Sequence, residues 1–166
     1  MSSSPRPDPV AAADAEARAL AHRLLQAGHA ALAWTDPATG TPGISRIAFA
    51  DDPELGPVTL ISGLAPHFAA LRAHPDCALM LGEIGAKGDP MTHPRLMIRA
   101  KATFLDRPDP ALRDRWLARN PKARIYIDLP DFAFVRLVAQ SALLNGGFAR
   151  AFRLTPEDLR HPTRAS

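Results

Sequence analysis

The feature that most constrains this chain is a series of about seven short strand-like segments with turn residues between them. The turns contain Asp, Pro and Gly, which favour sharp reversals of the backbone. The segments span residues 30–35, 43–50, 58–62, 77–82, 95–105, 132–138 and 148–154. A doubly wound parallel sheet needs a helix after nearly every strand, so this order predicts an antiparallel β-barrel with peripheral helices. We expect the first three strands to form a meander.

Helices are expected only outside the barrel strands. The first is predicted to run from Pro9 to about Ala27, because Asp8 is a favourable N-cap residue and Gly28 a favourable C-terminal cap. The other two are expected over residues 67–73 and 110–120.

The length and composition fit one globular domain. The chain has 166 residues, of which 46% are hydrophobic and 22% charged, close to the average of soluble domains. Residues 1–8 are rich in Ser and Pro and are predicted to be a flexible tail. Residues 9–166 are predicted to form the single domain.

The charge and hydropathy patterns argue against several classes of partner. The formal net charge is only +3 and the basic residues are scattered, whereas a nucleic-acid surface needs them clustered, so no nucleic acid is expected. No apolar run has membrane-spanning length, and the first ten residues lack a hydrophobic signal core. The single Cys77 cannot form an internal disulfide, and its apolar neighbours predict burial. We therefore expect a cytoplasmic protein without membrane contact.

Sequence motifs that carry chemistry by themselves are scarce. The six histidines show neither HxH nor HExxH spacing and have no cysteine partner, so no preformed metal site is expected. Gly146 and Gly147 form neither a dinucleotide fingerprint nor a phosphate loop. Ser62 lies outside any GxSxG motif, which disfavours a hydrolase. No catalytic residue can be assigned from the sequence.

The most specific feature is a series of short motifs in a fixed order between about Arg18 and Leu159. They lie at positions 36–37, 40, 42, 60–62, 64–67, 71, 75, 88–90, 93–96, 131–132 and 144–148. Together they resemble the FMN-binding split-barrel family related to pyridoxamine 5'-phosphate oxidase, and within it the HugZ-like group of haem-utilisation proteins. The resemblance implies a split β-barrel of the FMN-binding type.

The resemblance also implies a homodimer that holds FMN in two grooves between its subunits. The second strand and the loop after the third strand would hold the phosphate, since backbone amides at a helix start favour an anion. The residues expected to bind the cofactor are Ser45, Arg46, Ile61, Ser62, Ala65, His67, Phe68 and Arg95.

This chain departs from the family pattern at the phosphate-binding positions. True oxidases carry Arg and Lys on the second strand, and Ser, Arg and Lys in the loop. The corresponding positions here are Gly43, Ala48, Ala65, Pro66 and His67. Most of the basic contacts are therefore missing, and oxidation of pyridoxamine phosphate itself is not expected.

Three functional classes remain open at this point. The first is an FMN-dependent oxidoreductase of unknown substrate, in which the flavin performs the redox chemistry. The alternative is a haem-binding or haem-degrading protein of the HugZ type, for which His161 is a weak candidate for the axial ligand. The second alternative is a cofactor-free dimeric binding protein.

Overall fold

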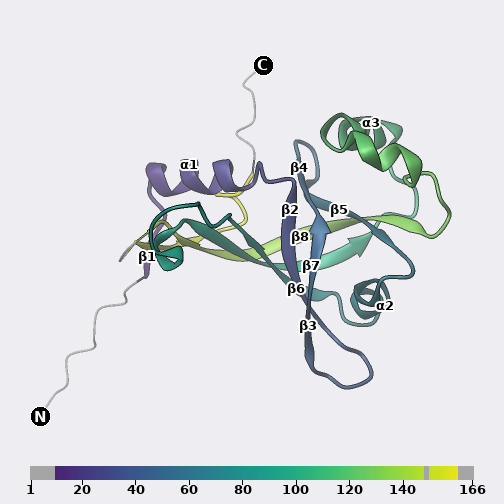
Figure 1. The fold of residues 1–166 in the computed structure, drawn as a ribbon, viewed down its shortest axis with the longest axis horizontal. Helices are drawn as coiled ribbons and strands as arrows, with labels where there is room; N and C mark the ends of the chain where they lie inside the picture. The colour runs from purple at the N-terminus through teal and green to yellow at the C-terminus, as the bar shows by residue number, and fades with distance from the viewer. Residues whose placement is uncertain (1–9, 148–149, 161–166) are drawn as a thin grey trace, which may run out of the picture.

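The computed structural model describes residues 10–147 and 150–160, and these form a strand-rich fold with peripheral helices (Figure 1). The strands are β1 (Val10–Ala12), β2 (His29–Thr35), β3 (Pro42–Ala48), β4 (Ala50–Asp52), β5 (Gly56–Ser62), β6 (Asp76–Leu81), β7 (Arg95–Phe104), β8 (Phe132–Asn145) and β9 (Ala151–Leu154). The α-helices are α1 (Ala15–Leu24), α2 (Pro66–Ala73) and α3 (Pro110–Arg119), and the 3-10 helices are η1 (Pro90–Thr92) and η2 (Pro121–Ile125). The predicted mainly β fold class is confirmed.

The strands form one sheet in the order β1-β9-β8-β7-β6-β2-β3, and β5 joins it through β8 while carrying β4 on its other side. Every pairing is antiparallel except the parallel pairing of β1 with β9. In Figure 1, α1 and β1 lie at one end of the molecule and α2 and α3 at the other, while the β2–β3 hairpin projects from the middle.

Two expectations about the barrel strands are wrong. The first three predicted strands do not form a meander, because β5 pairs with β4 and β8 while β2 pairs with β3 and β6. The last long strand extends over 14 residues to Asn145, well beyond the predicted end at residue 138. Its extra length is stabilised by hydrogen bonds to β7 and β9, which are pairings between segments distant in sequence.

The N-terminal helix also begins later than predicted. The Asp14 carboxylate accepts a hydrogen bond from the amide of Ala17 at 2.7 Å and caps α1, whereas Val10–Ala12 forms strand β1. The proposed cap Asp8 and the predicted tail lie outside the described residues, as do Phe148 and Ala149 of the last predicted strand.

The buried apolar residues form two clusters on either side of β5 and β8. The larger cluster fills the barrel and includes Leu32, Ile98 and Leu137. The smaller cluster lies under α3 and η2, where the buried Trp116 contacts Phe134 edge-to-face with ring centroids 5.5 Å apart. α3 is therefore attached to the sheet by its own core.

An ion pair reinforces the contact between α3 and β4. The Arg115 guanidinium donates to both carboxylate oxygens of the buried Asp52, at 2.7 and 3.1 Å. Burial raises the pKa of Asp52, but hydrogen bonds from Arg115 and from the amides of Glu54 and Leu55 outweigh it and hold this pKa below its ordinary value. Asp52 is thus ionised at neutral pH and bonded to α3.

We predict that Trp116→Ala lowers the free energy of unfolding by roughly 3–5 kcal/mol, because it leaves a large cavity in the smaller core. Ile125→Ala is the control, since Ile125 is 84% exposed, and it should change this free energy by no more than about 0.5 kcal/mol. Urea unfolding followed by circular dichroism measures both values. Equal losses in the two variants would show that α3 has no core of its own.

Candidate functional site: the hairpin, the β5–α2 loop and the outer sheet face

The β2–β3 hairpin positions a tryptophan directly over a glycine. Trp34 and Gly43 are cross-strand partners, and a Cβ atom on Gly43 would come within 2.4 Å of the indole ring. Only glycine allows the ring to lie this close to the strand. The indole Nε1 then reaches the Ser45 hydroxyl, to which it donates a hydrogen bond at 3.0 Å.

The same hydroxyl connects the hairpin to helix α2. His67 Nδ1 lies 3.1 Å from Ser45 Oγ, so Trp34, Ser45 and His67 form one hydrogen-bonded chain. His67 is only 8% exposed, and this burial lowers the pKa of its imidazole below the ordinary value. Burial therefore favours the neutral imidazole at neutral pH and opposes a positive charge at this position.

The backbone amides of the loop between β5 and α2 donate hydrogen bonds to acceptors within the protein. Gly63 donates to the carbonyl of Asp131 at 2.5 Å, and Ala65 donates to the carbonyl of Ser62 at 3.0 Å. The amide of Leu64 donates to Ser62 Oγ at 3.2 Å, and Ser62 Oγ donates to the Asp131 carboxylate at 3.0 Å. Pro66 has no amide hydrogen.

These bonds do not fit the phosphate of FMN at this loop. A phosphate-binding helix start needs amides that point to open space, whereas those of Gly63, Leu64 and Ala65 already have acceptors. The carboxylate beside Ser62 would also repel an anion. The assignment of FMN to these residues stays a prediction.

The structure divides the eight predicted cofactor-binding residues into two groups. Six lie in or beside the hairpin and the β5–α2 segment, and they are Ser45, Ile61, Ser62, Ala65, His67 and Phe68. Arg46 and Arg95 lie elsewhere, on the outer face of the sheet. Arg46 must face away from Ser45, because successive side chains of a strand point to opposite faces.

The outer face of the sheet is defined by two rows of cross-strand partners. One row contains Arg46, Ala31, Met80, Met97 and Leu143, and the other contains Ile44, Ala33, Ala78, Arg99 and Ser141. Large apolar side chains are exposed here, since Ile44, Met80 and Leu143 are 77%, 53% and 36% exposed. Three large apolar side chains therefore reach solvent on this face, where they can contact a ligand or a partner.

The arginines of the outer face have no acidic partner among the described residues. Arg46 and Arg99 form no ion pair there, and Arg95 donates only to the carbonyl of Met91 at 3.0 Å. Lys101 is different, since its ammonium lies 3.7 Å from the Asp76 carboxylate. The apolar outer face thus carries three positive charges that a bound anion can neutralise.

Two hollows cut into the outer face. The larger has a volume of about 550 Å³ and includes Ala33, Ala78, Arg99 and Gln140 in its lining. The smaller, of about 240 Å³, is lined in part by Met80, Met97, Arg95 and Leu143. The larger hollow is lined by small alanine side chains, which leave room for a ligand. Arg99 borders the larger hollow and Arg95 borders the smaller one.

Sequence reasoning missed Met80, Met97 and Arg99 as candidate site residues. The signal that could have found them is the alternation of strand side chains, because Arg95, Met97 and Arg99 share one face of β7 while Leu96 and Ile98 are buried on the other. Their alignment with Met80 depends on the register of β6 against β7, which no local pattern reveals.

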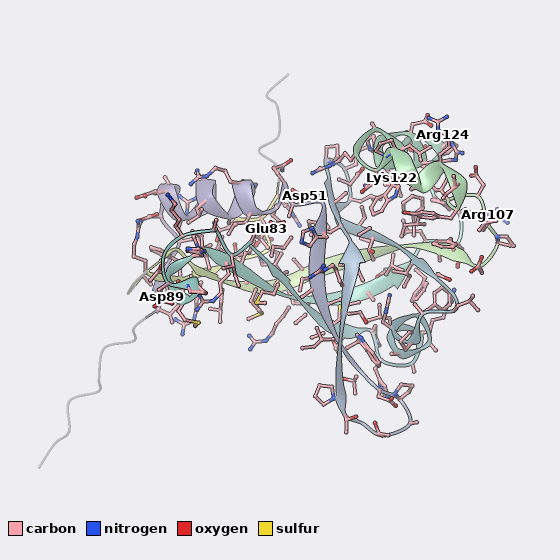
Figure 2. The ribbon with its side chains drawn as sticks, in the orientation of Figure 1. Asp51, Glu83, Asp89, Arg107, Lys122 and Arg124 are labelled. Atoms are coloured by element: carbon pink, nitrogen blue, oxygen red, sulfur yellow. The ribbon has the colours of Figure 1, made fainter. Side chains whose placement is uncertain are left out.

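The remaining histidines have different surroundings. Gly85 donates its amide to His93 Nδ1 at 2.6 Å and the other ring nitrogen lies 2.9 Å from the carbonyl of Lys87, so both nitrogens of His93 hold its loop. His29 Nε2 lies 3.4 Å from the carboxylate of Glu83, which is labelled in Figure 2. Residues 10–147 and 150–160 contain no cluster of three or more metal-ligating side chains. His161 lies outside the described residues.

Cys77 is half-buried and its thiol donates to the carbonyl of Ala100 at 3.5 Å. Burial raises the pKa of this thiol to about 11, so the reactive thiolate is scarce at neutral pH. Within the described part of the chain, no helix is long and apolar enough to cross a membrane.

No family model matches the chain. Among curated proteins, it is 32% identical over 114 residues to "Non-canonical heme oxygenase HOZ, chloroplastic" from Arabidopsis thaliana. That match covers 68% of this chain and 34% of the relative, so the chain spans about a third of the relative's length. One solved structure is 48% identical, with a TM-score of 0.83 over 90% of this chain and 99% of the other.

More distant solved structures share the fold. A heme binding protein from Mycobacterium smegmatis gives a TM-score of 0.77 at 24% identity, over 89% of this chain and 61% of the other. A pyridoxinephosphate oxidase family protein from Clostridium acetobutylicum gives 0.66 at 13% identity, over 89% of this chain and 99% of the other. The fold is thus a split β-barrel of the kind related to pyridoxamine 5'-phosphate oxidase. Within that family, the chain belongs to the HugZ-like group, as its motifs predict.

We predict that the stability of the fold falls as pH decreases from 7 towards 5, because the unfolded chain takes up a proton on His67 before the folded chain does. Burial lowers the pKa of His67 in the folded chain below its ordinary value of about 6.5. The contribution of neutral His67 to the free energy of unfolding is therefore complete above about pH 6.5, and it is lost as the pH falls through the pKa of the folded state. His67→Gln should have a flatter profile of melting temperature against pH. His74→Gln is the control, since His74 is exposed. Identical slopes in wild type and His67→Gln would contradict this role.

Proposed function

We propose that this chain is a haem-binding domain of the HugZ type and that it takes part in haem degradation. The observation that carries the proposal is the apolar outer face, with three arginines that lack acidic partners among the described residues. The 32% identity to a protein named a heme oxygenase supports it, as does the fold shared with a protein named a heme binding protein. The haem alternative therefore has better support than the flavin interpretation.

The shape and charge of the outer face complement those of haem. Haem is a flat apolar ring with two propionate groups at one edge, and it needs an apolar surface bordered by cations. Met80, Met97 and Leu143 are adjacent on the outer face. Arg95 and Arg99 lie on either side of Met97 along β7, each two residues away or roughly 7 Å. These residues would contact the ring and bind the propionates.

Bound haem would supply an iron centre at which oxygen can be activated for opening of the ring. The role of the described residues is then to bind and orient the haem and to exclude water from its face. His161 remains a candidate axial ligand, and the test of that assignment is whether His161→Ala shifts the Soret band of the loaded protein.

FMN-dependent oxidoreduction is the second candidate, favoured by the fold shared with the pyridoxinephosphate oxidase family protein. Three features disfavour it. The oxidase positions for basic residues are occupied by Gly43, Ala48, Ala65, Pro66 and His67, the β5–α2 amides are engaged, and Arg46 faces away from Ser45. If FMN binds, its phosphate must contact a different surface from the β5–α2 loop.

The proposal includes a homodimer formed through the outer face. A contiguous apolar surface of this kind marks an interface in most soluble proteins. Two copies of the outer face would bring Arg46, Arg95 and Arg99 near those of the partner, and like charges repel. An anionic ligand between the copies would remove this repulsion, so haem should strengthen the dimer. We also propose a cytoplasmic location, in keeping with a single cysteine that has no internal partner.

We predict that Arg95→Ala and Arg99→Ala each weaken haem binding by roughly tenfold, the usual effect of losing one charge-assisted hydrogen bond. Titration of the apo protein with haemin, followed at the Soret band, measures the dissociation constant. Lys122→Ala is the control, because Lys122 is an exposed cation of η2, beside α3 in Figure 2, and is not part of the outer-face rows. Unchanged affinity in both arginine variants would contradict the proposed haem surface.

A second prediction concerns the dimer. Met80→Lys should shift the protein towards monomer, because it adds a buried positive charge to an interface that already contains unpaired arginines. Ile125→Lys introduces the same charge at an exposed site on η2 and should leave the mass unchanged. Sedimentation velocity with and without haemin gives the oligomeric state. A Met80→Lys dimer as stable as wild type would exclude the outer face as the interface.

A further inference from the structure

A separate hollow of about 440 Å³ is lined by residues of α2, α3, β5 and β8. In Figure 1, α2 and α3 lie at the end of the molecule opposite to α1. Its floor is apolar and is built by Leu60, Ile127, Phe132 and Phe134 from β5, the segment after η2, and β8. Volumes of roughly 300–1,000 Å³ with an apolar lining and a few polar groups are typical of small-molecule sites. None of the residues of the outer face lines this hollow.

Arg72 lies at the rim of the hollow in a fixed orientation. Its guanidinium carbon lies 4.2 Å from the ring centroid of Phe104 and 5.4 Å from that of Phe68. Stacking on an aromatic ring restrains the guanidinium plane and leaves its N–H groups available to acceptors. No described residue forms a hydrogen bond or an ion pair with Arg72. The N–H groups of the Arg72 guanidinium are therefore free to donate hydrogen bonds to a carboxylate.

Some of the other charged side chains of the hollow form hydrogen bonds or ion pairs within the protein, and one does not. Arg113 donates to both oxygens of Asp128, at 2.8 and 2.5 Å, so these two charges neutralise each other. Asp109 accepts a hydrogen bond from the amide of Ala111 at 2.9 Å and caps α3. Asp106 has no hydrogen bond or ion pair with another described residue. Arg72 and Asp106 are thus the two charged groups of the hollow that have no hydrogen-bond or ion-pair partner among the described residues.

We propose that this hollow binds a small zwitterion with a large apolar side chain, namely a hydrophobic α-amino acid. Its carboxylate pairs with Arg72, its ammonium group pairs with Asp106, and its side chain lies on the floor of Leu60, Phe132 and Phe134. The opposite charges at the rim favour a zwitterion over a simple acid, which Asp106 and Asp109 would repel. This site is independent of the haem surface.

The test is a titration of the full chain with L-phenylalanine, followed by amide chemical shifts in 1H-15N NMR spectra. We expect saturable shifts at residues of the hollow, and at least a tenfold loss of affinity in Arg72→Gln and in Asp106→Asn. Arg107→Gln is the matched control, because Arg107 is an exposed cation in the same part of the molecule that does not line the hollow (Figure 2). It should leave the affinity unchanged.

Two analogues separate the contributions of the charged groups. 3-Phenylpropionate lacks the ammonium group and phenethylamine lacks the carboxylate, so each should bind at least tenfold more weakly than phenylalanine. The replaced side chains are exposed, and circular dichroism checks that each variant folds. No saturable binding, equal binding by either analogue, or wild-type affinity in Arg72→Gln would overturn the proposal.

Discussion

The hydrogen-bonded ladder of β8 is the interaction on which the rest of the structure depends. This 14-residue strand pairs with β5 through its first half, with β7 along most of its length and with β9 at its end. Buried backbone groups must find partners, and three neighbouring strands supply them here. β8 thereby separates the barrel core around Leu137 from the smaller core around Phe134. Loss of this ladder would detach both α3 and the C-terminal strand.

The register of this ladder also decides which side chains reach solvent. Because strand side chains alternate, the pairing of Leu143 with Met97 and of Met97 with Met80 creates a continuous apolar row. The same register exposes Arg95 and Arg99 on either side of that row. A slip of one residue would bury these arginines and expose the core, so the fold itself maintains the charged apolar surface that we assign to haem.

Much of the fold could be predicted from the sequence, because strands such as residues 30–35 and 58–62 have strong local β-propensity and clear turns around them. The second half of β8 could not, since residues 139–145 contain Ala, Gln, Ser and Asn, which have little preference for strands. The start of α1 was misplaced for a related reason. Asp8 and Asp14 are equally good caps, and the pairing of Val10 with Ala151 decides between them.

The fold class is confirmed, whereas the assignment of the cofactor-binding residues stays a prediction. The motifs identified the family, but they placed the cofactor at a loop whose amides are already engaged by Ser62 and Asp131. The hydrogen bond from Ser62 to Asp131 joins residues 69 positions apart, so it is invisible in a local pattern. The sequence offered Arg46 as a phosphate contact or as a residue on the other side of the strand, and the structure places it on the face opposite to Ser45. The proposed haem surface thus depends on strand register, which tertiary contacts set.

The most direct test of the haem proposal is the visible spectrum of the purified protein after incubation with equimolar haemin and FMN and removal of free ligand. The outer face predicts a sharp Soret band and no flavin bands. Retention of the twin flavin bands without a Soret band would contradict the proposal and restore the flavin oxidoreductase. A featureless spectrum would contradict both and leave a cofactor-free dimer.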